Sequence, residues 1–138
     1  MRSLWPGKLV LKGILDVEDA KRAASAGVDA IVVSNHGGRQ LDGARSSIAS
    51  LPDIANAVGD RIEVLFDGGI RSGQDVMKAL ASGARGCLIG RAFLYGLAAG
   101  GEAGVRRVLE LIRAELEVSM ALTGQRDIQA ITRDVIAP

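Results

Sequence analysis

The stretch KLVLKGILDVEDAKRAASAGVDAIVVS, residues 8–34, decides the fold, because an apolar run, a helical segment and a second apolar run follow one another in it. The apolar runs, residues 8–12 and 30–34, lack strict alternation, which is typical of strands buried on both faces. Residues 17–26 carry an alanine-rich face and stop at Gly27, a residue typical of helix C-termini. The stretch therefore predicts a strand-helix-strand unit of a parallel sheet.

The same alternation continues through the rest of the sequence. Pro52 suits the first position of a helix, and Ser72 followed three residues later by Asp75 resembles a capping box. The further predicted strands are residues 63–66 and 86–89, and the further predicted helices are residues 51–58, 72–82 and 104–122.

The last predicted helix is amphipathic, which suits packing on the outside of a barrel. Its apolar stripe consists of Val105, Val108, Leu109, Ile112, Leu116 and Met120, and the opposite face carries Arg106, Glu110, Arg113 and Glu117.

The chain also repeats itself at an offset of 56 residues, without a gap. The aligned pairs are Gly13-Ile14 with Gly69-Ile70, Asp19 with Asp75, Ala23 with Ala79 and Gly27 with Gly83. A repeat of two βα units is natural in a (β/α)₈ barrel, whose interior layers draw side chains from alternate strands. A doubly wound open sheet is the alternative, but no Gly-x-Gly-x-x-Gly follows the first strand.

A complete barrel needs about 250 residues, and only four strands are predicted here. We therefore expect residues 1–138 to form one domain fragment, the C-terminal half of a TIM (β/α)₈ barrel, with strands five to eight and a C-terminal helix.

Composition narrows the function classes. Seventeen basic and sixteen acidic residues leave a net charge of +1, so no sequence-wide field attracts nucleic acid or an anionic membrane. Cys87 and His36 are the only residues of their types, which excludes an internal disulfide and predicts no metal site. The longest uncharged run, residues 92–101, is too short to span a bilayer, and no signal peptide is recognisable. We expect a cytoplasmic protein without a transmembrane segment.

Two strand ends predict an anion site. The third predicted strand is followed by Asp67-Gly68-Gly69-Ile70-Arg71, and the fourth by Gly90-Arg91. Glycines let backbone amides approach an anion, arginines fork onto phosphate oxygens, and the helices starting here point positive dipole ends at the same place. For one such loop alone, a tight turn with a solvated arginine is as good an explanation as an anion site. Two matched loops favour phosphate, the ligand that barrels often bind after strands seven and eight.

The second predicted strand is followed by Ser34-Asn35-His36-Gly37-Gly38-Arg39. An isolated histidine is most often a buried, hydrogen-bonded one. Here the glycines leave room for a ligand, and Arg39 can clamp a carboxylate with two hydrogen bonds, so His36 is the candidate base. Lys12 ends the first predicted strand on the same barrel face, where it either stabilises a developing anion or simply leaves the core. The set suits a small hydroxy or keto acid.

These motifs, together with Leu11-Lys12-Gly13-Ile14 and the continuation Gln40-Leu41-Asp42 of the histidine motif, resemble the FMN-dependent 2-hydroxy-acid dehydrogenase and oxidase family over residues 8–123. The resemblance implies oxidation of an L-2-hydroxy acid to the 2-keto acid by an FMN enzyme. It implies that Lys12 faces the flavin N1/O2 edge, Ser34 contacts the flavin ring, His36 is the catalytic base, Arg39 binds the substrate carboxylate, and Asp67, Gly69, Arg71, Gly90 and Arg91 hold the ribityl phosphate.

The sequence departs from the family in two ways. It has no counterpart of the first four strands, which in the family supply the rest of the flavin pocket, substrate-facing tyrosines and a carboxylate that orients the histidine. Arg45 stands where the family often has proline. We therefore expect the isolated chain to be inactive and to associate with itself or with a complementary N-terminal half-barrel. The strand edges, residues 8–12 and 86–89, and the inward-facing apolar residues would form the contact. Those residues, on one or other side of the sheet, are Leu9, Leu11, Ile31, Val33, Val64 and Leu88.

Three other functions stay open at this point. The chain could be an FMN- or phosphate-binding fragment without turnover, or a structural fragment with vestigial motifs. A non-flavin phosphate barrel, such as a nucleotide-monophosphate enzyme, would share the two phosphate loops but would not need His36 beside Arg39.

Overall fold

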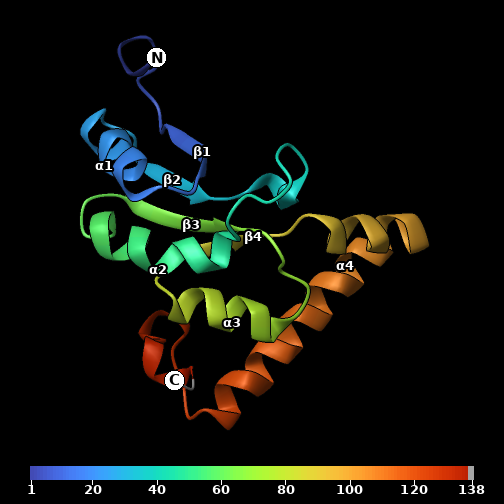
Figure 1. The fold of residues 1–138 in the computed structure, drawn as a ribbon. Coiled ribbons are helices and arrows are strands. Elements are labelled where there is room, and N and C mark those ends of the chain that lie inside the picture. Colours follow the sequence, from blue (N-terminus) through green and yellow to red (C-terminus); the bar gives the residue numbers. More distant parts are fainter. Residues whose placement is uncertain (137–138) are drawn as a thin grey trace.

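The computed structural model describes residues 1–136 and shows four parallel strands in the order β1-β2-β3-β4 (Figure 1). A helix follows each strand, which confirms the predicted half-barrel. The strands are β1 (Val10–Ile14), β2 (Ala30–Val33), β3 (Glu63–Asp67) and β4 (Gly86–Leu88), and the helices are α1 (Val17–Ser25), α2 (Ser47–Val58), α3 (Gly73–Ala81) and α4 (Arg91–Leu122). Short 3₁₀ turns cover Arg2–Leu4, His36–Gly38, Ile128–Ala130 and Arg133–Val135.

The main core lies between the sheet and the helices α1, α2 and α3. Ile31 and Val33 of β2, with Val64 and Phe66 of β3, are buried there against apolar side chains of the helices. Their alternate neighbours point to the other face of the sheet, and there Val10 is 48% exposed. The face that a closed barrel would enclose is therefore partly open.

This arrangement corrects the predicted inward-facing set. Leu9, Ile31, Val33 and Val64 belong to the helix side, because period-two alternation and the pairing of Ile31 with Val64 put them on one face. Leu88 pairs with Asp67 and lies on the open face. Leu11 is 44% exposed in the edge strand β1.

The start of α2 differs from the prediction. The helix begins at Ser47, so Pro52 lies inside it rather than at its first position. Sequence patterning missed the first turn because its inward positions, Ser47 and Ser50, are polar yet buried. Because proline has no N–H, the carbonyl of Ile48 has no i+4 donor, which is the local cost of this placement.

The start of α4 also differs, since the helix begins at Arg91 instead of residue 104. Two non-helical residues, Gly100 and Gly101, bend it into two segments. The segments cross where Gly96 meets Gly104, and a Cβ on Gly104 would overlap the carbonyl oxygen of Gly96. The second segment packs across α3 (Figure 1). The expected apolar stripe is confirmed except at Leu109, which is 47% exposed.

The starts of β2, β3 and β4 are as predicted, and only that of β1 differs. Strand β1 begins at Val10 rather than residue 8, which leaves Lys12 in the middle of the strand. The register against β2 shifts between Lys12 and Ile14, where Gly13 adopts φ 98°. The predicted capping box at the start of α3 is confirmed, with Ser72 and Asp75 each accepting from the other's backbone amide. Within residues 1–136, no helix combines the length and the apolar character that a membrane span requires.

Candidate active site

Lys12, Ser34 and Asp67 meet near the carboxyl ends of β1, β2 and β3. Lys12 Nζ lies 2.6 Å from Asp67 Oδ2 and 3.0 Å from Ser34 Oγ, and the Ser34 hydroxyl donates to Asp67 Oδ2 at 2.6 Å. Ser34 is almost fully buried, whereas the Lys12 side chain is 42% exposed. The single hydroxyl proton of Ser34 is thus used inside the protein, and the Lys12 ammonium keeps an open side for a ligand.

The charge state of Asp67 follows from these contacts. Partial burial acts to raise the pKa of this carboxyl, but hydrogen bonds from Lys12 and Ser34 outweigh burial and lower the pKa below its usual value. Asp67 is therefore ionised at neutral pH, and the pair with Lys12 is an ammonium-carboxylate pair.

His36 lies in a 3₁₀ turn directly after β2. Its φ is 54°, and it is the one non-glycine residue within residues 1–136 with a positive φ. Its backbone N–H donates to Ser34 Oγ at 3.1 Å, and the N–H of Gly37 donates to the side-chain oxygen of Asn35 at 2.9 Å. Sequence reasoning did not single out Asn35. The available signal was an Asn before a glycine pair, a pattern typical of Asx turns.

One cleft of about 470 Å³ gathers most of the predicted site residues. His36 and Arg39 lie at one part of it, and the loops after β3 and β4 line the rest. The predicted residues that it joins are His36, Arg39, Asp67, Gly69, Arg71, Gly90 and Arg91. Lys12 and Ser34 do not line this cleft and are joined to it through Asp67.

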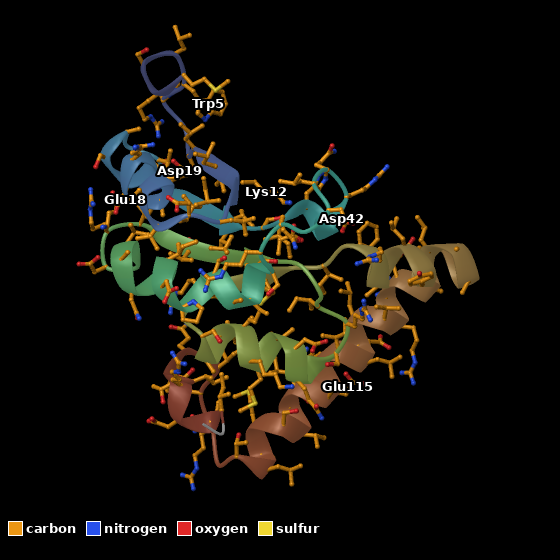
Figure 2. The ribbon with its side chains drawn as sticks, in the orientation of Figure 1. Trp5, Lys12, Glu18, Asp19, Asp42 and Glu115 are labelled. Atoms are coloured by element: carbon orange, nitrogen blue, oxygen red, sulfur yellow. The ribbon has the colours of Figure 1, made fainter. Side chains whose placement is uncertain are left out.

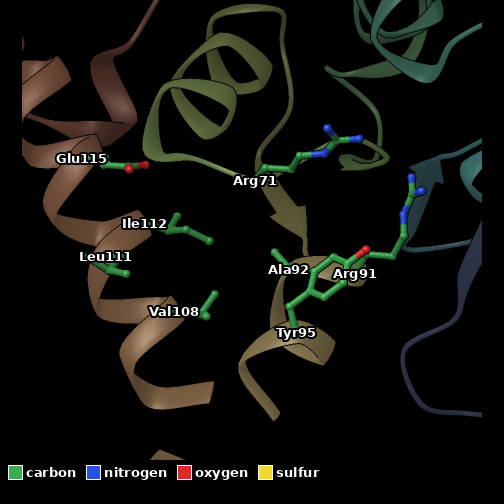
Figure 3. Close-up of a pocket in the computed structure, with 8 residues that line it drawn as sticks. All are labelled: Arg71, Arg91, Ala92, Tyr95, Val108, Leu111, Ile112 and Glu115. Carbon is green, nitrogen blue, oxygen red and sulfur yellow. The ribbon is translucent and has the colours of Figure 1, made fainter. Parts of the chain in front are cut away.

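One end of the cleft lies at the start of α4 and suits an anion. Figure 3 shows the neighbouring pocket, which shares Arg71, Arg91 and Ala92 with the cleft. In it the side chains of Arg71 and Arg91 extend away from the apolar side chains of the second segment of α4, which are Val108, Leu111 and Ile112. The N-cap of α4 is Gly90, and no side chain caps the amides of its first turn. A Cβ added at Gly69 or Gly90 would meet nothing within 4 Å. Free amides, two guanidiniums and open space suit a phosphate group.

The start of α3 is different, because its amides are already bound. The N–H groups of Arg71 and Ser72 both donate to Asp75 Oδ2 at 3.0 Å, and that of Gly73 donates to Glu115 Oε2 at 2.9 Å. Figure 2 shows Glu115 where α4 passes the start of α3. The first amides of α3 are thus already hydrogen-bonded within the protein, whereas no side chain caps the start of α4. The phosphate role of the two loops stays a prediction.

Two further residues, Arg45 and Cys87, have no part in the candidate site. Arg45, the departure from proline, donates to the carbonyl oxygen of Ala49 at 2.7 Å and so attaches to the start of α2. Burial raises the pKa of the Cys87 thiol to about 11, so the thiol is protonated and not a ready nucleophile. The part of the chain that the structure describes has no cluster of three or more His, Cys, Asp or Glu side chains able to hold a metal ion.

Parallel βα units with a phosphate-type cleft at the strand ends define part of a (β/α)₈-barrel enzyme. The whole chain, residues 1–138, matches the family of FMN-dependent dehydrogenases, and the chain belongs to that family.

Curated relatives match almost the whole chain. The L-lactate dehydrogenase of Caulobacter vibrioides (strain NA1000 / CB15N) is 61% identical over 137 residues, which are 99% of this chain and 36% of the relative. That of Azorhizobium caulinodans is 59% identical over 134 residues, 97% of this chain and 35% of the relative. The chain thus spans little more than a third of the length of these relatives.

Solved structures also match almost the whole chain. A crystal structure of mandelate oxidase with 3,3-difluoro-2-hydroxy-3-phenylpropionic acid superposes with a TM-score of 0.92 at 53% identity, covering 96% of this chain and 40% of the other. A mutant of (S)-mandelate dehydrogenase gives a TM-score of 0.93 at 48% identity, covering 97% and 37%.

The donors of the cleft fit the FMN that the family's description names. FMN carries a terminal phosphate, which suits the uncapped start of α4 between Arg71 and Arg91. The exposed side of the Lys12 ammonium suits an electron-rich ring edge.

Proposed function

We propose that this chain forms the phosphate-binding and histidine-bearing part of an FMN-dependent enzyme that oxidises a small L-2-hydroxy acid to the 2-keto acid. The observation that carries the proposal is the single cleft in which His36 and Arg39 lie beside the anion-binding start of α4. A cleft for phosphate alone would not need a base and a second guanidinium at its other end.

The chemistry divides between the cofactor and the chain. FMN, when bound, would supply the electron acceptor for the two electrons of this oxidation. A ring nitrogen of His36 takes the substrate proton. Arg39 holds the substrate carboxylate with two parallel hydrogen bonds and so fixes which substrate carbon faces the cleft.

The positively charged residues Lys12, Arg71 and Arg91 bind the cofactor in this proposal. Lys12, held by Asp67, would place a fixed positive charge beside the cofactor ring and so favour negative charge there. Arg71 and Arg91, with the backbone at Gly69 and Gly90, hold the cofactor phosphate.

The partner of this chain is the second half of the barrel, from a complementary N-terminal segment or from a second copy. Strands β1 and β4 are the edges of the sheet, each with one neighbour, and unpaired parallel edges favour strand addition. Val10 and Lys12 lie on the face of β1 that a closed barrel would enclose, and here both side chains are exposed. Because the relatives contain much that this chain does not span, we expect turnover only when a complementary half is present.

Complementation tests the function. The chain would be co-expressed with the remaining N-terminal segment of the Caulobacter vibrioides L-lactate dehydrogenase and titrated with FMN. We expect bound flavin that is bleached anaerobically by L-lactate, glycolate or L-mandelate. His36→Gln should keep the flavin and lose turnover, whereas Arg39→Lys should mainly weaken substrate binding. Flavin binding without bleaching in the complemented wild type would favour a binding module, and a colourless complex would refute the proposal.

A further inference from the structure

The turn that carries His36 has an unusual backbone. His36, Gly37 and Gly38 have φ of 54°, 70° and 69°, so three consecutive residues are left-handed. Glycine adopts this conformation freely, but for histidine the Cβ makes it unfavourable. Something outside the histidine must therefore hold it there.

Asn35 is the residue that receives the amides of this turn. Its side-chain oxygen accepts from Gly37 N at 2.9 Å, and its backbone oxygen accepts from Gly38 N at 3.0 Å. Ser34 Oγ accepts from His36 N at 3.1 Å, but Ser34 also binds Lys12 and Asp67. Asn35 is therefore the side chain whose observed bond serves the turn alone.

The Asn35 side chain lies beside the loop that follows β3. The residue is partly buried, and its Oδ1 lies 3.7 Å from the position that a Cβ on Gly68 would take. Gly68 has φ 127° and has no room for a side chain beside Ser47 Oγ. A side chain at position 68 would therefore overlap Ser47 and come into contact with the Asn35 side chain.

We propose that Asn35 is a positioning residue for His36. By binding the Gly37 amide, it keeps His36 left-handed and so keeps the imidazole at the cleft that it lines with Arg39. The functional consequence rests on the proposed role of His36 as base, but the conformational claim does not. Without the Asn35 side chain, the turn relaxes towards right-handed backbone, and the imidazole leaves its place.

The sole histidine of the chain makes the conformational claim directly measurable. Its imidazole gives one set of NMR signals, free of overlap from other histidines. In Asn35→Ala we expect this signal to move towards the position of free histidine and the Gly37 amide to exchange about tenfold faster, because one hydrogen bond of that amide is lost. Asn35→Asp keeps the acceptor oxygen and should restore both signals.

Asp42→Ala is the matched control, since Asp42 Oδ1 accepts from Gly43 N at 3.0 Å in the same loop without touching the turn. It should leave both signals unchanged. An unchanged imidazole signal and Gly37 exchange rate in Asn35→Ala would overturn the proposal, as would failure of Asn35→Asp to restore them. If Asn35→Ala does not fold, Asn35→Ser replaces it, because its shorter hydroxyl should give intermediate exchange of Gly37, and wild-type exchange would refute the role.

A second arm addresses the chemistry in the complemented enzyme. Asn35→Ala should lower kcat by about tenfold or more while FMN affinity stays unchanged, because a displaced base slows proton transfer and not cofactor binding. If the conformational shift occurs in an enzyme that never turns over, the proposed function fails and the positioning role stands. A shifted imidazole with unchanged kcat would overturn the functional part.

Discussion

The unit formed by β1 and α1 and the unit formed by β3 and α3 repeat in sequence at an offset of 56, and at this offset α1 and α3 have the same bounds, whereas β3 starts and ends three residues earlier than β1. Both have a left-handed glycine at the equivalent position, which is Gly13 inside β1 (φ 98°) and Gly69 just after β3 (φ 82°). In both units a left-handed glycine also follows the helix. Ala23 and Ala79 are buried at the same place in each helix. The residues that the units share are therefore those that build the scaffold.

The units differ where one of them borders the cleft. Leu15 packs against the core, but the equivalent Arg71 is exposed and lines the cleft. Val17 carries a side chain, but the equivalent Gly73 has none and lies against α4. We infer that the positions at which the repeat is broken are those that serve the cleft and the packing of α4. Four predictions test this difference between the units, from the largest expected effect to the smallest.

The largest effect is expected at Gly73. A Cβ there would overlap backbone atoms of α4 at residues 112–116, so α3 or α4 must move. We expect Gly73→Ala to lower the free energy of unfolding by about 3 kcal/mol, although alanine favours a helix. Urea denaturation measures this. Val17→Ala, the equivalent position of the first unit, should cost only about 1 kcal/mol, and equal costs at the two positions would contradict the close contact of α3 with α4.

The second prediction replaces a cleft residue of the β3–α3 unit by the residue at the equivalent position of the β1–α1 unit. Arg71→Leu copies Leu15 and should weaken FMN binding to the complemented barrel about tenfold, because a charge-assisted phosphate contact is lost. Fluorescence titration with FMN measures it. Arg113→Leu is the control, since Arg113 pairs with Glu117 on the outer face of α4. Equal FMN affinity in wild type and Arg71→Leu would remove Arg71 from the phosphate site.

The third prediction concerns the helix caps, which the two units share in function but not in residue type. Asp16 caps α1 and Ser72 caps α3. Alanine at either position should cost about 1 kcal/mol of stability, measured by thermal or urea unfolding. FMN affinity should not change in Ser72→Ala, because Asp75 still holds the amides that precede α3. A clear loss of FMN affinity would mean that the start of α3 takes part in phosphate binding.

The smallest effect is expected at the opposite end of the strands, where Asp29 of the first unit corresponds to Arg85. Hydrogen bonds from Lys8 and from the backbone of Leu9 lower the pKa of Asp29 to about 2. A lowered folded-state pKa stabilises the fold above the unfolded-state value of about 4, and this stabilisation is lost as the pH falls towards 2. Asp29→Asn should therefore flatten the loss of stability between pH 4 and 2, whereas Arg85→Gln should not. Parallel acid-unfolding curves for wild type and Asp29→Asn would disprove the contribution.

Much of the fold was predictable because its signals are local in the sequence. Apolar runs, terminal glycines and the Ser72 cap each act within a few residues of themselves, so the strands and most helix ends followed from them. The starts of α2 and α4 did not, because buried serines and a glycine crossing obtain their meaning from neighbours distant in sequence.

The candidate site divides in the same way. The sequence by itself determined that His36, Arg39, Arg71 and Arg91 follow neighbouring strands, and the carboxyl ends of parallel strands meet at one edge. Only the tertiary structure decided that Glu115, distant in sequence, accepts from the amide of Gly73, while no side chain caps the start of α4. It also decided the Lys12, Ser34 and Asp67 network, because hydrogen bonds between strands depend on register and side-chain direction, which no single strand encodes.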